Sequence, residues 1–143
     1  MGKLIFLDID GVLRRVTSNP SCFDQDCLDN FESAVRQCDK SKIVISSTWR
    51  LAMPLKELRS RFSPDVAARI VGITPENFED EVYERHAEIK AFLEEKKVTA
   101  LPWLAIDDDP AHFPGGCPVL FTDPNKGFDA ECAVRLVKML RDC

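Results

Sequence analysis

The chain has 143 residues, of which 45% are hydrophobic and 30% are charged, a balance typical of a soluble globular protein. Its 19 Lys and Arg residues against 24 Asp and Glu residues give a net charge of −5, which argues against non-specific nucleic-acid binding by the whole surface. The length predicts a single domain over residues 1–143. No apolar stretch approaches the roughly 18 residues of a membrane span, and the N-terminus does not resemble an export signal, so we expect a cytoplasmic protein without membrane contact.

The six cysteines are spread irregularly, and no two of them are separated by only two residues. A disulfide framework or a zinc site would normally show closer spacing. His86 and His112 also stand apart from the cysteines. We therefore expect reduced thiols in a reducing compartment.

The first predicted elements are a strand, a loop and a helix. Residues 3–7 form a short apolar run that is typical of a buried strand. Residues 11–23 are rich in turn formers and predict a loop or small flap. Asp24 is a candidate N-cap for a helix that extends to Cys38 and carries apolar residues at helical spacing.

The middle of the chain continues the alternation. Residues 43–45 predict a second buried strand. Pro54 suits the first turn of a helix over residues 54–62. Residues 70–73 predict a third strand, which is weakened by Gly72.

The last part of the chain predicts a helix over residues 84–97, strands over residues 103–106 and 119–121, and a helix over residues 129–140. Strands that alternate with helices predict an α/β fold. We expect a three-layer, doubly wound, Rossmann-like arrangement around a mainly parallel five-stranded sheet.

Acidic or hydroxyl residues follow three of these predicted strands directly: Asp8 and Asp10, then Ser46, Ser47 and Thr48, then Asp107, Asp108 and Asp109. Each pattern alone is common in turns and helix caps, but parallel strands bring their carboxyl ends to one edge of the sheet. Carboxylates crowded there would repel one another unless a cation lay between them. Oxygen ligands without clustered His or Cys indicate Mg²⁺.

Three segments resemble motifs of the haloacid dehalogenase (HAD) superfamily. LIFLDIDGVL at residues 4–13 is similar to its first motif, hhhhDxDGxL, and IVISSTWR at residues 43–50 resembles the second. WLAIDD at residues 103–108 is similar to the fourth motif, and the likeness extends over roughly residues 3–140. The strings SSTWR and IDDDP look most like those of small HAD-like domains that occur alone or in RNA-repair proteins.

The resemblance implies a phosphatase that acts through an aspartyl-phosphate. Asp8 would be the nucleophile. Asp10 would be the general acid for the leaving group and then the general base for water. The carboxylate of Asp8, the backbone carbonyl of Asp10, and an acid from Asp107 or Asp108 would bind Mg²⁺.

The resemblance also implies phosphate-binding groups. Ser46 would donate to a phosphoryl oxygen, together with backbone N–H groups of the turn that begins at Ser47. The basic residue of the third motif is best matched by Arg85, with Lys56 and Lys90 as alternatives.

The spacing between motifs leaves no room for a folded cap domain in residues 11–45 or 47–84. We expect an open site that suits a large substrate, such as a phosphorylated protein or a polynucleotide end, or that a partner subunit closes in a homo-oligomer. Trp49 and Arg50 would line the entrance for the substrate, unless Trp49 serves packing alone.

The predicted function is that of a Mg²⁺-dependent phosphatase. One alternative is a phosphoacceptor like a response-regulator receiver domain, although receivers place a lone acceptor Asp after their third strand. The other alternative is a phosphate-binding or regulatory module that has kept the fold without turnover. Intact Asp8, Asp10, Ser46 and Asp107 argue against it.

Overall fold

The computed structural model describes residues 2–76, 78 and 80–141. Its strands are β1 (Leu4–Leu7), β2 (Lys42–Ile45), β3 (Ile70–Ile73), β4 (Trp103–Asp107) and β5 (Val119–Phe121). They form one sheet in the order β3-β2-β1-β4-β5, and every neighbouring pair is parallel. The predicted five-stranded parallel sheet is confirmed.

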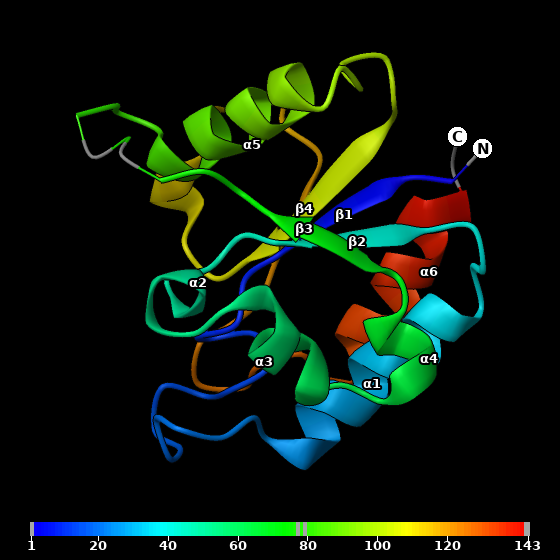
Figure 1. Ribbon diagram of the computed structural model, residues 1–143. Helices are drawn as coiled ribbons and strands as arrows, with labels where there is room; N and C mark the ends of the chain where they lie inside the picture. The colour runs from blue at the N-terminus through cyan, green and yellow to red at the C-terminus, as the bar shows by residue number, and fades with distance from the viewer. Residues whose placement is uncertain (1, 77, 79, 142–143) are drawn as a thin grey trace.

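The helices are α1 (Gln25–Arg36), α2 (Trp49–Ala52), α3 (Leu55–Ser60), α4 (Pro64–Ala67), α5 (Glu84–Glu95) and α6 (Ala130–Arg141), with a short 3₁₀ helix η1 (Pro110–His112). Helix α5 covers one face of the sheet, whereas α1, α3, α4 and α6 cover the other (Figure 1). The molecule therefore has the three layers expected of a doubly wound α/β fold.

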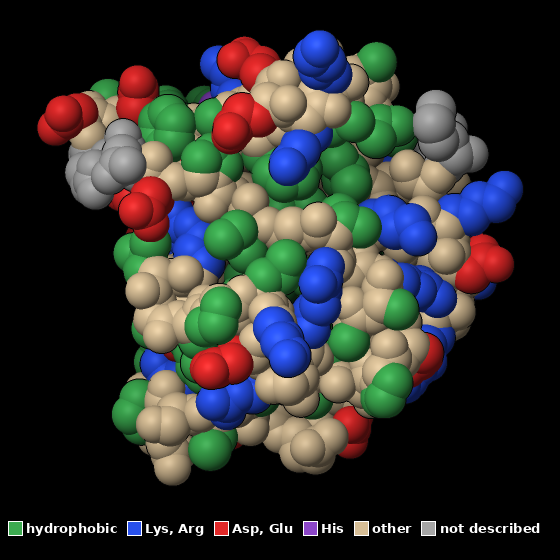
Figure 2. All heavy atoms as spheres, viewed as in Figure 1, with side chains coloured by type: hydrophobic (Ala, Val, Ile, Leu, Met, Phe, Trp, Pro, Cys, Tyr) green, Lys and Arg blue, Asp and Glu red, His purple; other side chains and the backbone are tan. Residues whose placement is uncertain are grey.

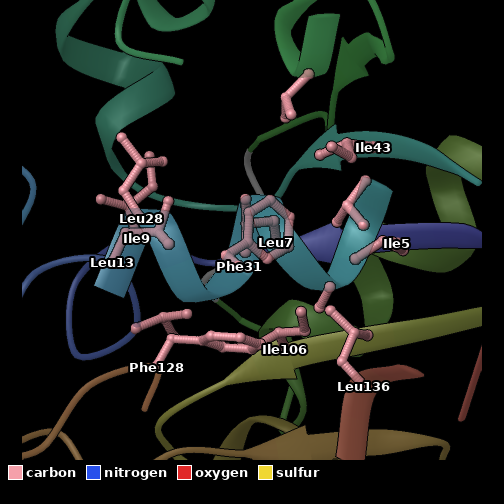
Figure 3. Close-up of a cluster of buried hydrophobic side chains, with 14 of the residues drawn as sticks. Ile5, Leu7, Ile9, Leu13, Leu28, Phe31, Ile43, Ile106, Phe128 and Leu136 are labelled. Atoms are coloured by element: carbon pink, nitrogen blue, oxygen red, sulfur yellow. The ribbon is translucent and has the colours of Figure 1, made fainter. Parts of the chain in front are cut away.

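Both faces of the sheet are buried, which explains why the central strands appear as unbroken apolar runs in the sequence. On one face, Leu7 and Ile106 pack with Phe31 of α1 and with Phe128 (Figure 3). On the other face, Phe6 meets Phe92 of α5 edge to face, with ring centroids 5.6 Å apart. Two apolar layers thus hold the sheet and leave its strand ends as the place for polar groups.

The strand order places a topological switch point between β1 and β4. The chain moves outward from β1 to β2 and β3 and then crosses back to β4 on the other side of β1. In open α/β sheets, ligands bind outside the carboxyl ends of strands at such a switch point. Receiver domains have the order 2-1-3-4-5 instead, so the receiver-like alternative is wrong.

The helix predicted over residues 54–62 is observed as α3, but the segment between β2 and β3 also contains two short helices that the sequence did not predict. This segment forms α2, α3 and α4 in succession. Helix α4 is a separate element because the carboxylate of Glu32 accepts hydrogen bonds from the backbone N–H (2.8 Å) and the hydroxyl (2.7 Å) of Ser63, its N-cap residue. These short helices use the chain between the two strands, and the described part of the molecule contains no cap domain.

Asp24 stands at the N-cap of α1, as predicted, but its side chain does not cap the helix. Its carboxylate accepts hydrogen bonds from the backbone N–H of Arg15 and the hydroxyl of Ser18, both at 2.8 Å. Asp24 therefore holds the loop of residues 11–23, a long-range contact that local spacing could not reveal.

The described cysteines, Cys22, Cys27, Cys38, Cys117 and Cys132, are free thiols. Cys143 lies outside the described residues. Within residues 2–76, 78 and 80–141, no helix has both the length and the apolar character needed to cross a membrane.

Candidate active site

The register of the sheet brings three polar residues to its carboxyl edge. Leu7 of β1 pairs with Ile45 of β2 on one side and with Ile106 of β4 on the other. One residue further along these strands lie Asp8, Ser46 and Asp107. The backbone N–H of Asp8 donates to Ile106 O (3.0 Å), and that of Ser46 donates to Leu7 O (2.8 Å). The ladder therefore continues far enough to hold these residues in place.

Three carboxylates crowd together at this edge. Asp8, Asp107 and Asp108 each place an oxygen within 4.8 Å of the others. Asp8 and Asp107 are buried, and Asp108 is partly buried. Burial, and then the neighbouring Asp107 carboxylate, raise the pKa of Asp8 well above its ordinary value. The same two causes raise the pKa of Asp108.

The acid cluster fits a divalent cation. Its donors are carboxylate oxygens, which suit Mg²⁺ better than a softer metal. The raised pKa values of Asp8 and Asp108 show that the negative charges are poorly compensated by the protein alone. A bound cation would remove this cost, so the residues present fit the metal that the motif pattern predicted.

Arg85 of α5 is the basic residue that reaches the cluster. Its Nη2 lies 3.9 Å from Oδ1 of Asp8, and its Nε lies 3.9 Å from Oδ2 of Asp107. The residue is only 8% exposed. Lys56 on α3 and Lys90 on α5 are exposed, and in the described residues the ion pair to Asp8 is made by Arg85. The geometry thus favours Arg85 over the two lysines.

A buried carboxylate holds Arg85 in position. Glu88 is 1% exposed, and its Oε1 accepts from Nη1 of Arg85 at 3.2 Å. Its Oε2 accepts from Nη2 of Arg50 at 2.7 Å. Glu88 therefore bridges two guanidinium groups, and its negative charge compensates theirs where water has little access.

Asp10 lies beside the cluster but in a more exposed place, since 41% of its side chain is accessible. Its Oδ1 accepts hydrogen bonds from Nε of Arg14 at 2.8 Å and from Nε1 of Trp49 at 2.9 Å. Both donors engage the same oxygen of the Asp10 carboxylate.

The two serines after β2 differ in their surroundings. Ser47 is fully buried, and its Oγ accepts the backbone N–H of Trp49 at 3.3 Å. Its hydroxyl oxygen is therefore engaged within the turn, and the backbone N–H groups of this turn remain the expected contribution of Ser47 to phosphate binding. Ser46 lies next to Asp8 by register and remains the candidate phosphate donor.

A family model described as the HAD domain in Swiss Army Knife RNA repair proteins matches residues 4–133. This match covers nearly all of the chain, including the strand ends that carry the acids. The chain belongs to this family. No curated protein matches the chain closely enough to add a relative. Membership indicates a phosphohydrolase-type activity for this HAD domain, and the suspected resemblance to HAD domains of RNA-repair proteins is confirmed.

His112 is a site residue of the HAD domain that sequence reasoning missed. Its Nδ1 lies 3.2 Å from Oδ1 of Asp107, and its pKa is raised chiefly by this hydrogen bond. Asp109 accepts the N–H of Ala111 and starts helix η1, which turns His112 back toward the strand end. The five-residue separation from Asp107 was the available signal, but it has meaning only once η1 is known.

The two residues expected at the entrance behave differently in the HAD domain. The Arg50 side chain is buried at 4% exposure, and it donates to carbonyls after β2 and β3, so its expected place at the entrance is wrong. Trp49 is 9% exposed and packs against Phe23, with ring centroids 5.2 Å apart. It serves packing, yet its indole N–H reaches Asp10.

Proposed function

We propose that this HAD domain is a Mg²⁺-dependent phosphomonoester hydrolase that acts through an aspartyl-phosphate on Asp8. The main support is the position of Asp8 at the switch point of the sheet, close both to Arg85 and to Asp107 and Asp108 at the end of β4. A nucleophile buried there lies near a cationic guanidinium and near a candidate cation site. Both groups favour an anionic phosphate beside an anionic nucleophile.

In the first step, a carboxylate oxygen of Asp8 bonds to phosphorus while the bond from phosphorus to the leaving oxygen breaks. Asp10 donates a proton to that leaving oxygen. Arg85 and Ser46 bind the non-bridging oxygens and orient the phosphoryl group. In the second step, Asp10 takes a proton from water, whose oxygen attacks the phosphorus and releases Asp8 and inorganic phosphate.

The proposed metal ligands are Asp8, Asp107 and Asp108, with the backbone carbonyl of Asp10. When bound, Mg²⁺ would supply electrostatic stabilisation of the charge on the transferred phosphoryl group. Glu88 would keep Arg85 oriented throughout, and His112 would orient the Asp107 carboxylate, as outer partners of metal ligands commonly do.

We further propose that the substrate is a phosphorylated polynucleotide end. The family description, which refers to RNA repair proteins, supports this class. The absence of a cap domain from the described residues also suits it, because an uncovered strand edge admits a long chain.

The test compares wild type with Asp8→Asn and with Asp39→Asn, an exposed aspartate in the α1–β2 loop. Phosphate release would be measured with sugar phosphates, nucleotides, phosphopeptides and phosphorylated oligonucleotides, in Mg²⁺ and in excess chelator. We expect turnover in Mg²⁺ that Asp8→Asn abolishes and Asp39→Asn retains, because an amide cannot serve as the nucleophile. Undiminished turnover in folded Asp8→Asn would refute the proposal, and phosphate binding without any turnover would favour the non-catalytic module.

A further inference from the structure

A hollow of about 380 Å³ opens beside the candidate active site. It is lined by Pro20, Ser21, Thr48, Trp49, Ala52, Met53 and Arg61, which come from the loop after β1, from α2 with its flanking residues, and from the end of α3. Small-molecule sites usually have volumes of roughly 300–1,000 Å³. The hollow is therefore large enough for a substrate group well beyond the phosphate.

The hollow shares a wall with the proposed general acid. Trp49 lines it, and the same indole donates to Oδ1 of Asp10 at 2.9 Å. Under the proposed function, Asp10 protonates the leaving oxygen, so the leaving group must lie on the Asp10 side of the phosphate. Atoms attached to that oxygen would extend past Trp49 into the hollow. The inference that follows rests on the proposed function in this one respect.

The lining of the hollow is mostly apolar and carries one charged group. Among the described residues that line it, Arg61 bears the only charge. The Arg61 guanidinium lies over the Trp49 ring, 5.9 Å from its centroid, and Nη1 donates to Ser21 O at 3.0 Å. The planar group is thus held close to the aromatic wall, with further N–H donors for a ligand. Such a surface suits a flat, anionic or electron-rich partner.

The charge around the hollow points to the same kind of partner. Helix α3 and the residue after it carry three basic residues, Lys56, Arg59 and Arg61, against one acidic residue, Glu57. Figure 2 shows Lys and Arg side chains on the face of the molecule that carries α3. This local positive charge contrasts with the net charge of −5 for the chain. It favours a ligand with phosphates beyond the one that reacts.

We propose that the hollow is a leaving-group subsite that binds the terminal nucleoside of a phosphorylated single-stranded polynucleotide. The base enters the apolar hollow, where an Arg guanidinium can stack on it. Arg61 and Lys56 attract the next phosphodiester. A phosphoserine peptide would place only an alkyl side chain there, and this side chain offers no flat face for a planar guanidinium to stack on.

The first experiment fills the hollow without touching Arg61. Ala52→Phe adds bulk at an exposed position that lines the hollow, and Leu51→Phe adds a ring at the neighbouring position, which is 59% exposed and does not line it. For each variant, kcat/KM would be measured on phosphorylated tetranucleotides with a 3′- or 5′-phosphate, on glycerol phosphate and on a phosphoserine peptide. We expect Ala52→Phe to lower the ratio of oligonucleotide to glycerol phosphate kcat/KM by about tenfold, as for loss of one stacked base. Leu51→Phe should leave the ratio near the wild-type value.

The second experiment removes the cation. Arg61→Ala should lower the same ratio by about tenfold, Arg61→Lys should recover part of it, and Arg135→Ala, an exposed arginine on α6, should not change it. Equal losses on oligonucleotide and glycerol phosphate would overturn the proposal. So would a loss that falls mainly on the phosphopeptide, since the hollow would then serve a different leaving group.

A binding measurement separates this proposal from the proposed function. Fluorescence anisotropy with a labelled, phosphorylated tetranucleotide would give Kd for wild type, Ala52→Phe and Arg61→Ala. If no phosphomonoester is hydrolysed but both substitutions weaken binding about tenfold, the proposed hydrolase function is refuted and the nucleoside subsite is supported. If small phosphomonoesters are hydrolysed but neither substitution alters oligonucleotide binding or turnover, the hydrolase stands and the subsite is refuted.

Discussion

The carboxylate of Asp108 occupies the space that a Cβ atom on Gly11 would need. Gly11 also has a φ of +79°, a conformation that side-chain-bearing residues rarely adopt. Thr122 fixes the same residue from the other side, because its hydroxyl donates to Gly11 O at 2.7 Å. Glycine is therefore required at position 11 by the packing of Asp108, an acid of the candidate metal site, as well as by the turn.

Gly11→Ala should lower both stability and activity. The backbone strain alone would cost about 1–2 kcal/mol, and displacement of Asp108 should reduce kcat/KM by about 10²-fold, as small misplacements of site groups do. Gly116→Ala is the matched control, because its φ is +88° and nothing lies within 4 Å of the added Cβ. It should lose stability alone. Thermal unfolding and phosphatase assays would check both variants, and an equal effect of the two on activity would contradict the prediction.

Asp107 and Asp108, at the end of β4, should determine the Mg²⁺ concentration that activity requires. Asp107→Asn and Asp108→Asn should each raise the Mg²⁺ concentration for half-maximal activity, by about 10–100-fold or more. Asp107→Asn should have the larger effect, because this buried residue also faces Arg85 and His112. Titrations of activity with Mg²⁺ would measure this, with Asp39→Asn as control. Full activity in excess chelator would remove the metal from the proposed mechanism.

Asp10→Asn should separate the two proton transfers. With an alkyl phosphate, loss of the general acid should cost about 10²–10⁴-fold in rate. With p-nitrophenyl phosphate, the leaving group needs little help, so the aspartyl-phosphate should form and accumulate. Rapid-quench kinetics should then show a burst of nitrophenol followed by slow turnover. Equal losses on both substrates without a burst would assign Asp10 to the metal site or the fold.

The ion pair between α1 and α4 should make stability depend on pH. Arg36 donates to Asp65 through Nε at 2.7 Å and Nη2 at 2.9 Å, and this lowers the pKa of Asp65 from 3.8 to about 2. A depressed folded-state pKa means that the stabilisation is present above the unfolded value and is lost as pH falls through the folded one. Asp65→Asn should therefore lower Tm at pH 7, and the difference from wild type should shrink between about pH 4 and pH 2. A difference in Tm that stays constant over this range would contradict the assignment.

The central strands and the edge that carries the candidate site were predictable, because parallel strands buried on both faces appear as continuous apolar runs in the sequence. Asp8, Ser46 and Asp107 each follow such a run, and strand register alone makes them neighbours. The family match spans residues 4–133 and so includes all three of these strand ends.

The features that the sequence did not predict depend on contacts between residues far apart in the chain. Glu32 binds Ser63 at the start of α4, a helix that the sequence did not predict, and no local rule links these two positions. Arg50 meets Glu88 in the same way. Its position just after Ser47 and Thr48 does not indicate that the guanidinium is buried, so the sequence led us to expect Arg50 at the entrance. Residue spacing along the chain does not predict such pairs of polar groups from distant segments.

The hydrogen bonds of Arg50 also determine how the parts of the domain around the candidate site are joined. Its guanidinium donates to Ser47 O at 2.7 Å, to Thr74 O at 3.0 Å and to Glu88 at 2.7 Å, so it joins the ends of β2 and β3 to α5. Glu88 also accepts a hydrogen bond from Arg85, so a single buried carboxylate links Arg85 to the same strand ends. Under the proposed function, a change at Arg50 would therefore alter the position of Arg85 as well as that of the strand ends.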